Sequence, residues 1–365
     1  MKFRTSSSIA GIKPYEPGKP LSAFAREYQI DSVVKLASNE NPLGFSPKVF
    51  AAVQDTLSGM HRYPEPVAHD LCCALAEKYR VAPENIVLGN GSDDLIALLA
   101  HAFLDPGDQA LMPLPSFLMY EISVRTAKGV PVMVPLSDFD TNLCALVENI
   151  SSRTRMVFVT NPFNPTGTAI TRGAFQAFAA KIPSDVLIVV DEAYMEFVRD
   201  PQVFNSLENP LQDERIVTLR TFSKAYGLAG FRIGYGIMNK EAAMILNRIR
   251  QPFNVNGLAQ AAAQAALADQ IFLHHTVDII HQGIDFLTAE LSALGLTPLP
   301  TQANFLMVDV KTDAETIFQK LLRQGVIVRS MKSYGFDTFL RVNAGTWEEN
   351  QAFVSALKSV LASDA

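Results

Sequence analysis

Two cations, Lys224 and Arg232, lie among four glycines in the otherwise largely apolar run T-F-S-K-A-Y-G-L-A-G-F-R-I-G-Y-G, residues 221–236. A buried ammonium is costly unless it is paired or used chemically. The apolar strand R-I-V-T-L-R is expected just before this run, so Lys224 follows a strand end. Apolar walls and a second cation lower the pKa of a lysine, and its amine can then attack a carbonyl. Lys224 is therefore a candidate nucleophile, although an isolated lysine is usually a surface residue.

A glycine-containing turn precedes an expected helix in L-G-N-G-S-D-D-L-I, residues 88–96. Gly89 and Gly91 permit a tight turn, and Ser92 is a good helix N-cap. The free N–H groups of the first helical turn bind anions such as phosphate. An ordinary capped helix is the simpler interpretation of this motif alone. A dinucleotide site is disfavoured because Leu95 stands near the position where the fingerprint G-x-G-x-x-G needs its third glycine.

Two further polar residues follow apolar strands. Asp191 directly continues V-L-I-V-V, and Asn161 follows M-V-F-V-T in the proline-stiffened loop N-P-F-N-P-T-G. Ligands bind at the carboxyl ends of strands in open α/β sheets, where an acid can hold magnesium or pair with a protonated ring nitrogen. An anion site, an acid, a fixed amide and a nucleophilic lysine are together what pyridoxal 5'-phosphate requires.

The elements that must position these residues alternate along the first part of the chain. Continuously apolar strands indicate a sheet that is buried on both faces. We therefore expect an α/β fold with a mostly parallel central sheet flanked by helices, and a smaller α+β domain near the C-terminus. The expected helices are 46–57, 67–79, 92–103, 271–294, 315–323 and 348–361, and the expected strands are 86–88, 109–112, 130–134, 156–160, 186–190, 215–220, 305–309, 326–329 and 339–342.

Length and composition narrow the class of protein. The 365 residues include 48% apolar and 19% charged residues, with a net charge of -6. This composition is that of a globular protein and leaves no basic patch for nucleic acid or membrane. No signal peptide or membrane span is expected, which predicts a cytoplasmic protein. The three cysteines show neither a disulfide framework nor metal-ligand spacing.

The order N-P-x-N-P-T-G, D-E-A-Y and S-K-x-x-G-L-A-G-x-R-x-G resembles the fold type I aminotransferases. More narrowly, P-Y-E-P-G-K-P, K-L-A-S-N-E-N-P-L-G, R-Y-P and L-G-N-G-S-D-D resemble the histidinol-phosphate aminotransferases, over essentially the whole chain. The resemblance implies an N-terminal segment at residues 1–45 that packs with the small domain and the active site. It also implies a large cofactor-binding domain at 46–255 and a small domain at 256–365 with a long connecting helix.

The resemblance assigns roles around pyridoxal 5'-phosphate. It implies that Lys224 bonds to the cofactor aldehyde and moves a proton, and that Asp191 keeps the pyridine nitrogen protonated. Tyr194 and Asn161 would bind the phenolic oxygen, and Phe117 would stack on the ring. The implied phosphate ligands are the backbone of Ser92 and Asp93, the residues Thr221, Ser223 and Arg232 and, from a partner subunit of a homodimer, Tyr63.

The resemblance implies that the substrate is bound by Tyr15, Asn41, Arg329 and Arg341. Arginine suits this role because it binds carboxylate or phosphate through two parallel hydrogen bonds. Two departures concern substrate choice: R-Y-P-E-P-V-A-H lacks the acid–glycine run frequent after R-Y-P in this family, and Phe117 stands where tyrosine is frequent.

The expected reaction is amino transfer between histidinol phosphate and imidazole acetol phosphate, with glutamate and 2-oxoglutarate as the other pair. An aromatic amino-acid aminotransferase of the same fold is the main alternative, with Arg341 binding a carboxylate. A phospho-amino-acid decarboxylase, a dinucleotide-dependent dehydrogenase and a non-catalytic regulator are the other candidates that these residues leave open.

Overall fold

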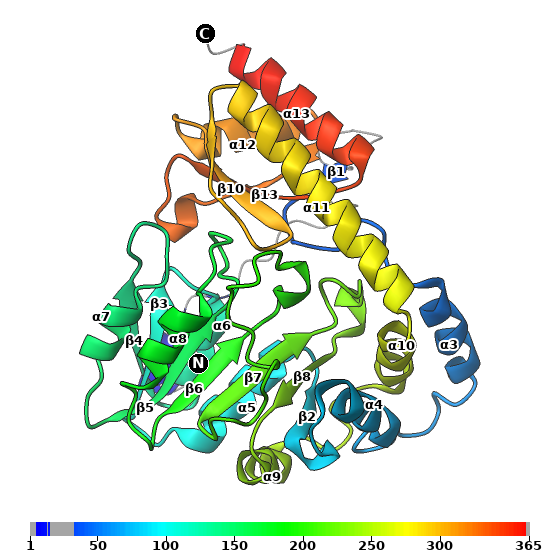
Figure 1. Ribbon diagram of the computed structural model, residues 1–365, viewed down its shortest axis with the longest axis vertical. Helices are drawn as coiled ribbons and strands as arrows, with labels where there is room; N and C mark the ends of the chain where they lie inside the picture. The colour runs from blue at the N-terminus through cyan, green and yellow to red at the C-terminus, as the bar shows by residue number, and fades with distance from the viewer. Residues whose placement is uncertain (1–4, 13, 15–32, 363–365) are drawn as a thin grey trace.

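The structure is a computed structural model that describes residues 5–12, 14 and 33–362. A seven-stranded sheet lies below a smaller four-stranded sheet, and the helix α11 runs beside the small sheet and down toward α10 (Figure 1). The α-helices are α1 (Ser7–Ala10), α3 (Pro47–Leu57), α4 (His69–Tyr79), α5 (Ser92–Phe103), α6 (Leu118–Thr126), α7 (Leu143–Glu148), α8 (Arg172–Ala179), α9 (Lys240–Ile249), α10 (Gly257–Leu267), α11 (Gln270–Ala293), α12 (Ala314–Arg323) and α13 (Trp347–Ala362).

The large sheet has the strand order β2-β8-β7-β6-β5-β3-β4. All neighbouring pairs are parallel except those that β8 makes with β2 and β7. The expected mostly parallel central sheet is therefore confirmed. Its strands are β2 (Ile86–Gly89), β3 (Gln109–Leu114), β4 (Val130–Pro135), β5 (Thr154–Thr160), β6 (Leu187–Asp191), β7 (Ile216–Thr221) and β8 (Gly234–Ile237).

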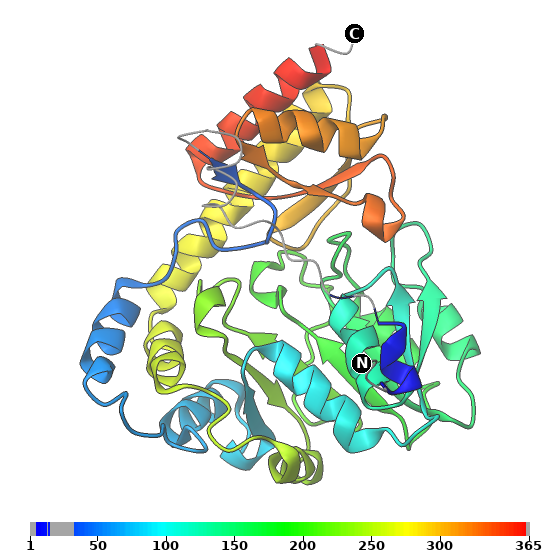
Figure 2. The same ribbon diagram turned by 180° about the vertical axis from the view of Figure 1, so that it is seen from behind.

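Helices cover both faces of this sheet, which explains its continuously apolar strands. On β5, Met156 and Phe158 pack with residues of α5, α6 and α9, while Val157 and Val159 pack with residues of α7 and α8. The helices α5 and α6 lie in front of the sheet when the molecule is seen from behind (Figure 2). Side chains within the strands are thus buried under helices on one face or the other, and only those at the strand ends are available to form a site.

The small sheet has the order β12-β13-β10-β9, and a separate two-stranded parallel pair joins β1 to β11. The strand expected at 326–329 is therefore two strands that belong to different sheets, because the chain changes partners at Val328. The strands of this part are β1 (Val34–Lys35), β9 (Thr297–Pro298), β10 (Phe305–Asp309), β11 (Val326–Ile327), β12 (Arg329–Ser330) and β13 (Phe339–Asn343).

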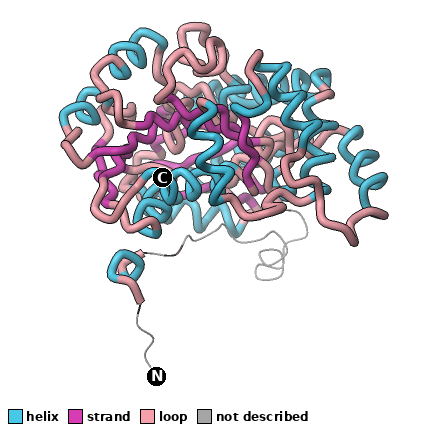
Figure 3. The backbone as a smooth tube through the Cα atoms, turned by 90° about the horizontal axis from the view of Figure 1, so that it is seen from below, coloured by secondary structure: helices cyan, strands magenta, loops and turns pink. Residues whose placement is uncertain are grey.

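The strand β8, G-Y-G-I, was not predicted, because glycines weaken strand propensity. They are needed here for close packing: a Cβ on Gly234 would lie 2.6 Å from the backbone nitrogen of Ser92. Strands occupy the interior and helices the outside when the molecule is seen from below (Figure 3). Among the described residues, no helix is long and apolar enough to span a membrane.

Candidate active site

A cavity of about 270 Å³ opens where the carboxyl ends of β5, β6 and β7 meet the small sheet. Thr160, Asp191 and Thr221 are the last residues of these three strands, and all three line the cavity. The cavity brings together most of the residues predicted from the sequence. These are Ser92, Asp93, Phe117, Asp191, Tyr194, Thr221, Ser223, Lys224, Arg232, Arg329 and Arg341.

Lys224 lies in the cavity with its Nζ donating a hydrogen bond to the carbonyl oxygen of Ser38 at 3.0 Å. Burial, followed by the nearby Arg341 guanidinium, lowers the pKa of Lys224 to about 8. An appreciable fraction of this amine is therefore uncharged near neutral pH. The uncharged form is the nucleophile, so the geometry suits attack on a carbonyl and later proton transfer.

Asp191 is buried at the end of β6 and accepts hydrogen bonds from the Tyr120 hydroxyl at 2.7 Å and the Ala193 N–H at 3.2 Å. Burial raises the pKa of Asp191 to about 6, and these two hydrogen bonds oppose the rise. A buried carboxylate of this kind gains most from a cationic partner. A protonated ring nitrogen is such a partner.

The turn before α5 forms a tight cradle for an anion. Gly91 has a φ of +84°, and a Cβ there would lie 2.5 Å from the Arg232 guanidinium. Arg232 itself donates to the Asp93 carboxylate at 3.3 Å. Thr221 and Ser223 lie beside this cradle, and the Ser223 N–H donates to the Thr221 hydroxyl at 3.1 Å. A guanidinium, two hydroxyls and the N–H groups of a helix start together match a phosphate group.

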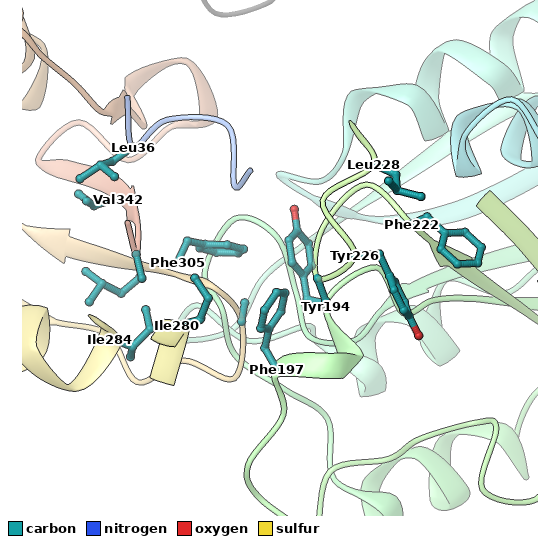
Figure 4. Packing of buried hydrophobic residues seen from close by; sticks show 14 of the residues in the cluster. Leu36, Tyr194, Phe197, Phe222, Tyr226, Leu228, Ile280, Ile284, Phe305 and Val342 are labelled. Atoms are coloured by element: carbon teal, nitrogen blue, oxygen red, sulfur yellow. The ribbon is translucent and has the colours of Figure 1, made fainter. Parts of the chain in front are cut away.

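Tyr194 connects the two sheets. Its ring contacts the ring of Phe305 edge to face at 5.2 Å, and it lies between Phe305 on one side and Tyr226 on the other (Figure 4). Its hydroxyl accepts a hydrogen bond from Asn39 Nδ2 at 3.0 Å. Burial raises the pKa of Tyr194, so the phenol keeps its proton at neutral pH. The hydroxyl is thus available as a hydrogen-bond donor.

Arg329 and Arg341 form the other end of the cavity. They are directly opposite residues of the antiparallel pair β12–β13, so their side chains leave the same face of the sheet. Arg341 is buried and donates to Asn164 Oδ1 at 2.6 Å and to the Ala37 carbonyl at 3.0 Å. Its guanidinium also lies over the Phe305 ring at 5.2 Å. This end therefore presents two cations to an anionic ligand, and Arg341 is held in place by its neighbours.

The structure corrects the interpretation of Asn161. Its side chain donates to the Phe204 carbonyl at 2.7 Å and accepts from the Ile170 N–H at 2.8 Å, and it does not line the cavity. Successive strand residues point to opposite faces, and Thr160, which precedes Asn161, already faces the cavity. Asn164 of the same loop lines the cavity instead.

Two further predicted residues lie elsewhere. Asn41 donates to the Ala225 carbonyl at 3.0 Å and does not line the cavity. Tyr63 is 82% exposed and stacks on Phe253 at 4.6 Å, also outside the cavity. Tyr15 lies outside the described residues.

Sequence reasoning missed Asn39, Tyr120, Thr160 and Asn164, which all line the cavity. Tyr120 lies on α6, where it reads as an ordinary core residue, and its ring is indeed stacked on Phe158. Asn39 and Asn164 stood within the quoted motifs S-N-E-N-P and N-P-F-N-P-T-G. The motifs were therefore noticed, but the direction of each side chain could not be read from them.

Comparison with known proteins agrees with this geometry. Residues 31–357 match the family model "Aminotransferase class I and II". "Histidinol-phosphate aminotransferase 2" of Carboxydothermus hydrogenoformans is 44% identical over 358 residues, which is 97% of this chain and 98% of that protein. The protein of the same name from Methylococcus capsulatus is 45% identical over 359 residues, 97% of each.

Solved structures give the same result for the fold. The crystal structure of histidinol-phosphate aminotransferase from Sinorhizobium meliloti, in complex with pyridoxal-5'-phosphate, superposes with a TM-score of 0.90 at 28% identity. That superposition covers 99% of this chain and 98% of the other. Thermus thermophilus aspartate aminotransferase with maleate is similar at a TM-score of 0.84 and 25% identity, over 98% of this chain and all of the other.

Proposed function

Because the chain belongs to the class I and II aminotransferases, we propose that it is a pyridoxal 5'-phosphate-dependent histidinol-phosphate aminotransferase of histidine biosynthesis. The proposed reaction transfers the amino group between L-histidinol phosphate and 2-oxoglutarate, giving imidazole acetol phosphate and glutamate. The relatives that carry this name are more than 40% identical over almost the full chain, which supports the same substrate pair here.

The residues present fit the cofactor. The cradle around Gly91 has no room for a Cβ beside Arg232, as a site for close backbone approach to a phosphate requires. We propose that Arg232 and the backbone N–H groups of Ser92 and Asp93 hold this phosphate together with Thr221 and Ser223.

The ring end of the cofactor has its own partners. Pyridoxal phosphate supplies an electron sink for the negative charge that develops at the substrate carbon bearing nitrogen. Asp191 would keep the ring nitrogen protonated, and Tyr194 would donate a hydrogen bond to the phenolic oxygen. Phe117 would pack on the ring, and Lys224 would hold the cofactor at its carbonyl carbon, with loss of water, and carry the proton to and from the substrate carbon. Asn164 takes the place that the sequence analysis gave to Asn161.

One observation in particular supports a phosphorylated substrate. Arg329 and Arg341 are directly opposite across β12–β13 and line one cavity. Arginine binds phosphate or carboxylate through parallel hydrogen bonds. A phosphate dianion carries enough oxygens and charge to bind both guanidinium groups, whereas a carboxylate carries a single charge. Tyr15 and Asn41 remain proposed contributors to the substrate end.

The experiment is a panel of amino donors given to the purified, cofactor-loaded protein. Conversion of the cofactor to its pyridoxamine form is followed by absorbance for L-histidinol phosphate, L-glutamate and L-phenylalanine. We expect L-histidinol phosphate to react with the highest kcat/KM and Lys224→Ala to react with none of the three. A clear preference for L-phenylalanine would instead identify an aromatic amino-acid aminotransferase.

We also propose a homodimer in which Tyr63 contacts the cofactor phosphate bound by the partner subunit. Exposed Tyr63, Met60 and Val67 provide an apolar surface of the kind that interfaces cover. The test mixes inactive Lys224→Ala subunits with Tyr63→Ala subunits. Each mixed dimer then regains one complete site, so activity returns on mixing; if Tyr63 acts within its own subunit, mixing restores nothing.

The division into domains and the cellular location belong to the same proposal. The chain is divided into the N-terminal segment 1–45, the large domain 46–255 and the small domain 256–365. The enzyme acts in the cytoplasm, because a doubly charged phosphate ester does not cross a bilayer unaided. Limited proteolysis with mass spectrometry tests the first feature and cell fractionation the second.

A further inference from the structure

Asn39 is a cavity residue that no motif assigned a role. Its side chain is 2% exposed, and its backbone has a φ of +54°. Two asparagines, one at the end of β13 and one just before β10, fix this backbone: Asn343 Oδ1 accepts from the Asn39 N–H at 3.1 Å, and Asn304 Nδ2 donates to the Asn39 carbonyl at 3.2 Å. The conformation of Asn39 is therefore imposed from the side of β10 and β13.

The side chain of Asn39 makes one hydrogen bond among the described residues, from Nδ2 to the Tyr194 hydroxyl. An amide NH2 can only donate, so the Tyr194 oxygen is the acceptor in this pair. The phenolic proton of Tyr194 then has to point elsewhere, and Tyr194 lines the cavity. A residue that accepted from Tyr194 would instead draw this proton away from the cavity.

We propose that Asn39 is a positioning residue that directs the phenolic proton of Tyr194 toward the phenolic oxygen of the bound cofactor. The proposal rests on the proposed function, since it needs the cofactor in this cavity. Asn304 and Asn343 hold the backbone of Asn39, and Asn39 holds the hydroxyl of Tyr194. The orientation of this hydroxyl therefore depends on the position of the small sheet relative to the end of β6.

The neighbouring residues strengthen this dependence. Ala37 accepts a hydrogen bond from Arg341, and Ser38 accepts one from Lys224. Three consecutive residues of this segment therefore each bond to a different side chain of the site. A displacement of residues 37–39 would therefore alter the hydrogen bonds of Arg341, Lys224 and Tyr194 at the same time.

The test is the pH at which the visible absorbance of the cofactor-loaded enzyme changes. A donor to an anionic oxygen stabilises the deprotonated form of the cofactor. Asn39→Gly, which tolerates the positive φ, is therefore expected to raise this midpoint by about one pH unit. Asn39→Asp, which can only accept, is expected to raise it at least as far. The charged groups around Tyr194 are Arg341, Asp191, Asp93 and Lys224, and all four stay unchanged in these variants.

A double-mutant cycle separates positioning from packing. In a Tyr194→Phe background, Asn39→Gly is expected to shift the midpoint by less than about 0.2 pH unit. Asn350→Ala is the control, because Asn350 is a buried asparagine whose side chain bonds only the backbone of Gly345 among the described residues. It is expected to lower stability and leave the midpoint unchanged.

Two results overturn the inference: no shift in Asn39→Gly and Asn39→Asp, or the same shift with and without the Tyr194 hydroxyl. Failure of the wild-type protein to take up pyridoxal 5'-phosphate would overturn the proposed function instead.

Discussion

Replacing Asp191 by asparagine is expected to have opposite effects on the cofactor-free and the cofactor-loaded protein. The Asp191 carboxylate is buried with hydrogen bonds from Tyr120 and Ala193 but without a cation among its described hydrogen-bond partners. Asparagine fits the same space. Its oxygen accepts from the Ala193 N–H and its amide donates to the Tyr120 hydroxyl, which turns its own proton to Thr160, 2.9 Å away.

The size of the effect follows from the pKa of Asp191. Burial raises it from 3.8 to about 6, which corresponds to about 3 kcal/mol in the cofactor-free protein at neutral pH. Because the folded pKa is the higher one, Asp191 imposes no penalty on stability below its unfolded pKa, and its destabilising contribution grows as the pH rises through about 6. Asp191→Asn does not titrate, so we expect it to be more stable by about 1–3 kcal/mol at pH 8.

The cofactor reverses this preference, because a charged hydrogen bond to the ring nitrogen is lost in the variant. We expect the affinity for pyridoxal 5'-phosphate to fall by about 10- to 150-fold. The assay compares apparent unfolding temperatures of the cofactor-free proteins between pH 5 and pH 8, together with a cofactor titration.

Asp313→Asn is the control for this experiment, because the pKa of Asp313 is lowered to about 2 by hydrogen bonds from Lys332 and Thr316. Its effect on stability is therefore constant over the same pH range. A cofactor-free Asp191→Asn protein that is less stable than wild type at pH 8, or whose advantage does not grow with pH, would refute the burial argument.

Three other substitutions test other parts of the site. Gly91→Ala has a disfavoured positive φ and displaces the Arg232 guanidinium, so cofactor titration should give about 10- to 100-fold weaker binding; unchanged binding would contradict the cradle. Arg341→Lys loses a planar fork, and steady-state kinetics should give at least about a tenfold rise in KM for L-histidinol phosphate; an unchanged KM would place the anion elsewhere. Glu192→Gln weakens a buried ion pair with Arg220, and chemical denaturation should give a loss of about 3 kcal/mol; a loss below about 1 kcal/mol would mean that the pair is dispensable.

The cofactor half of the site was readable from the sequence because each of its parts is a short contiguous motif at a strand end. Lys224 follows β7, Asp191 ends β6, and Ser92 begins α5 after β2. Apolar strands are easily recognised, and the carboxyl ends of parallel strands lie at one edge of a sheet. The convergence of these motifs in one cavity therefore required only the fold class.

The direction of individual side chains could not be predicted in the same way. In N-P-F-N-P-T-G, both asparagines lie in the loop after β5, and the folded loop directs Asn164 into the cavity and Asn161 toward the Phe204 carbonyl. Likewise, Asn39 is distant in sequence from the residues that hold it, and its φ of +54° is set by Asn304 and Asn343. Contacts made across such long stretches of chain leave no local pattern.

The two ends of the cavity explain why the substrate was harder to read than the cofactor. Arg232 lies in the phosphate cradle of the large sheet, whereas Arg329 and Arg341 belong to the small sheet and Arg341 contacts Asn164 and Ala37. If the cofactor phosphate occupies the first end, the two arginines at the second end can bind an anionic group of the substrate. We expect this group to be the phosphate of L-histidinol phosphate. The two arginines lie together because of the register of β12 against β13, which only the folded chain reveals.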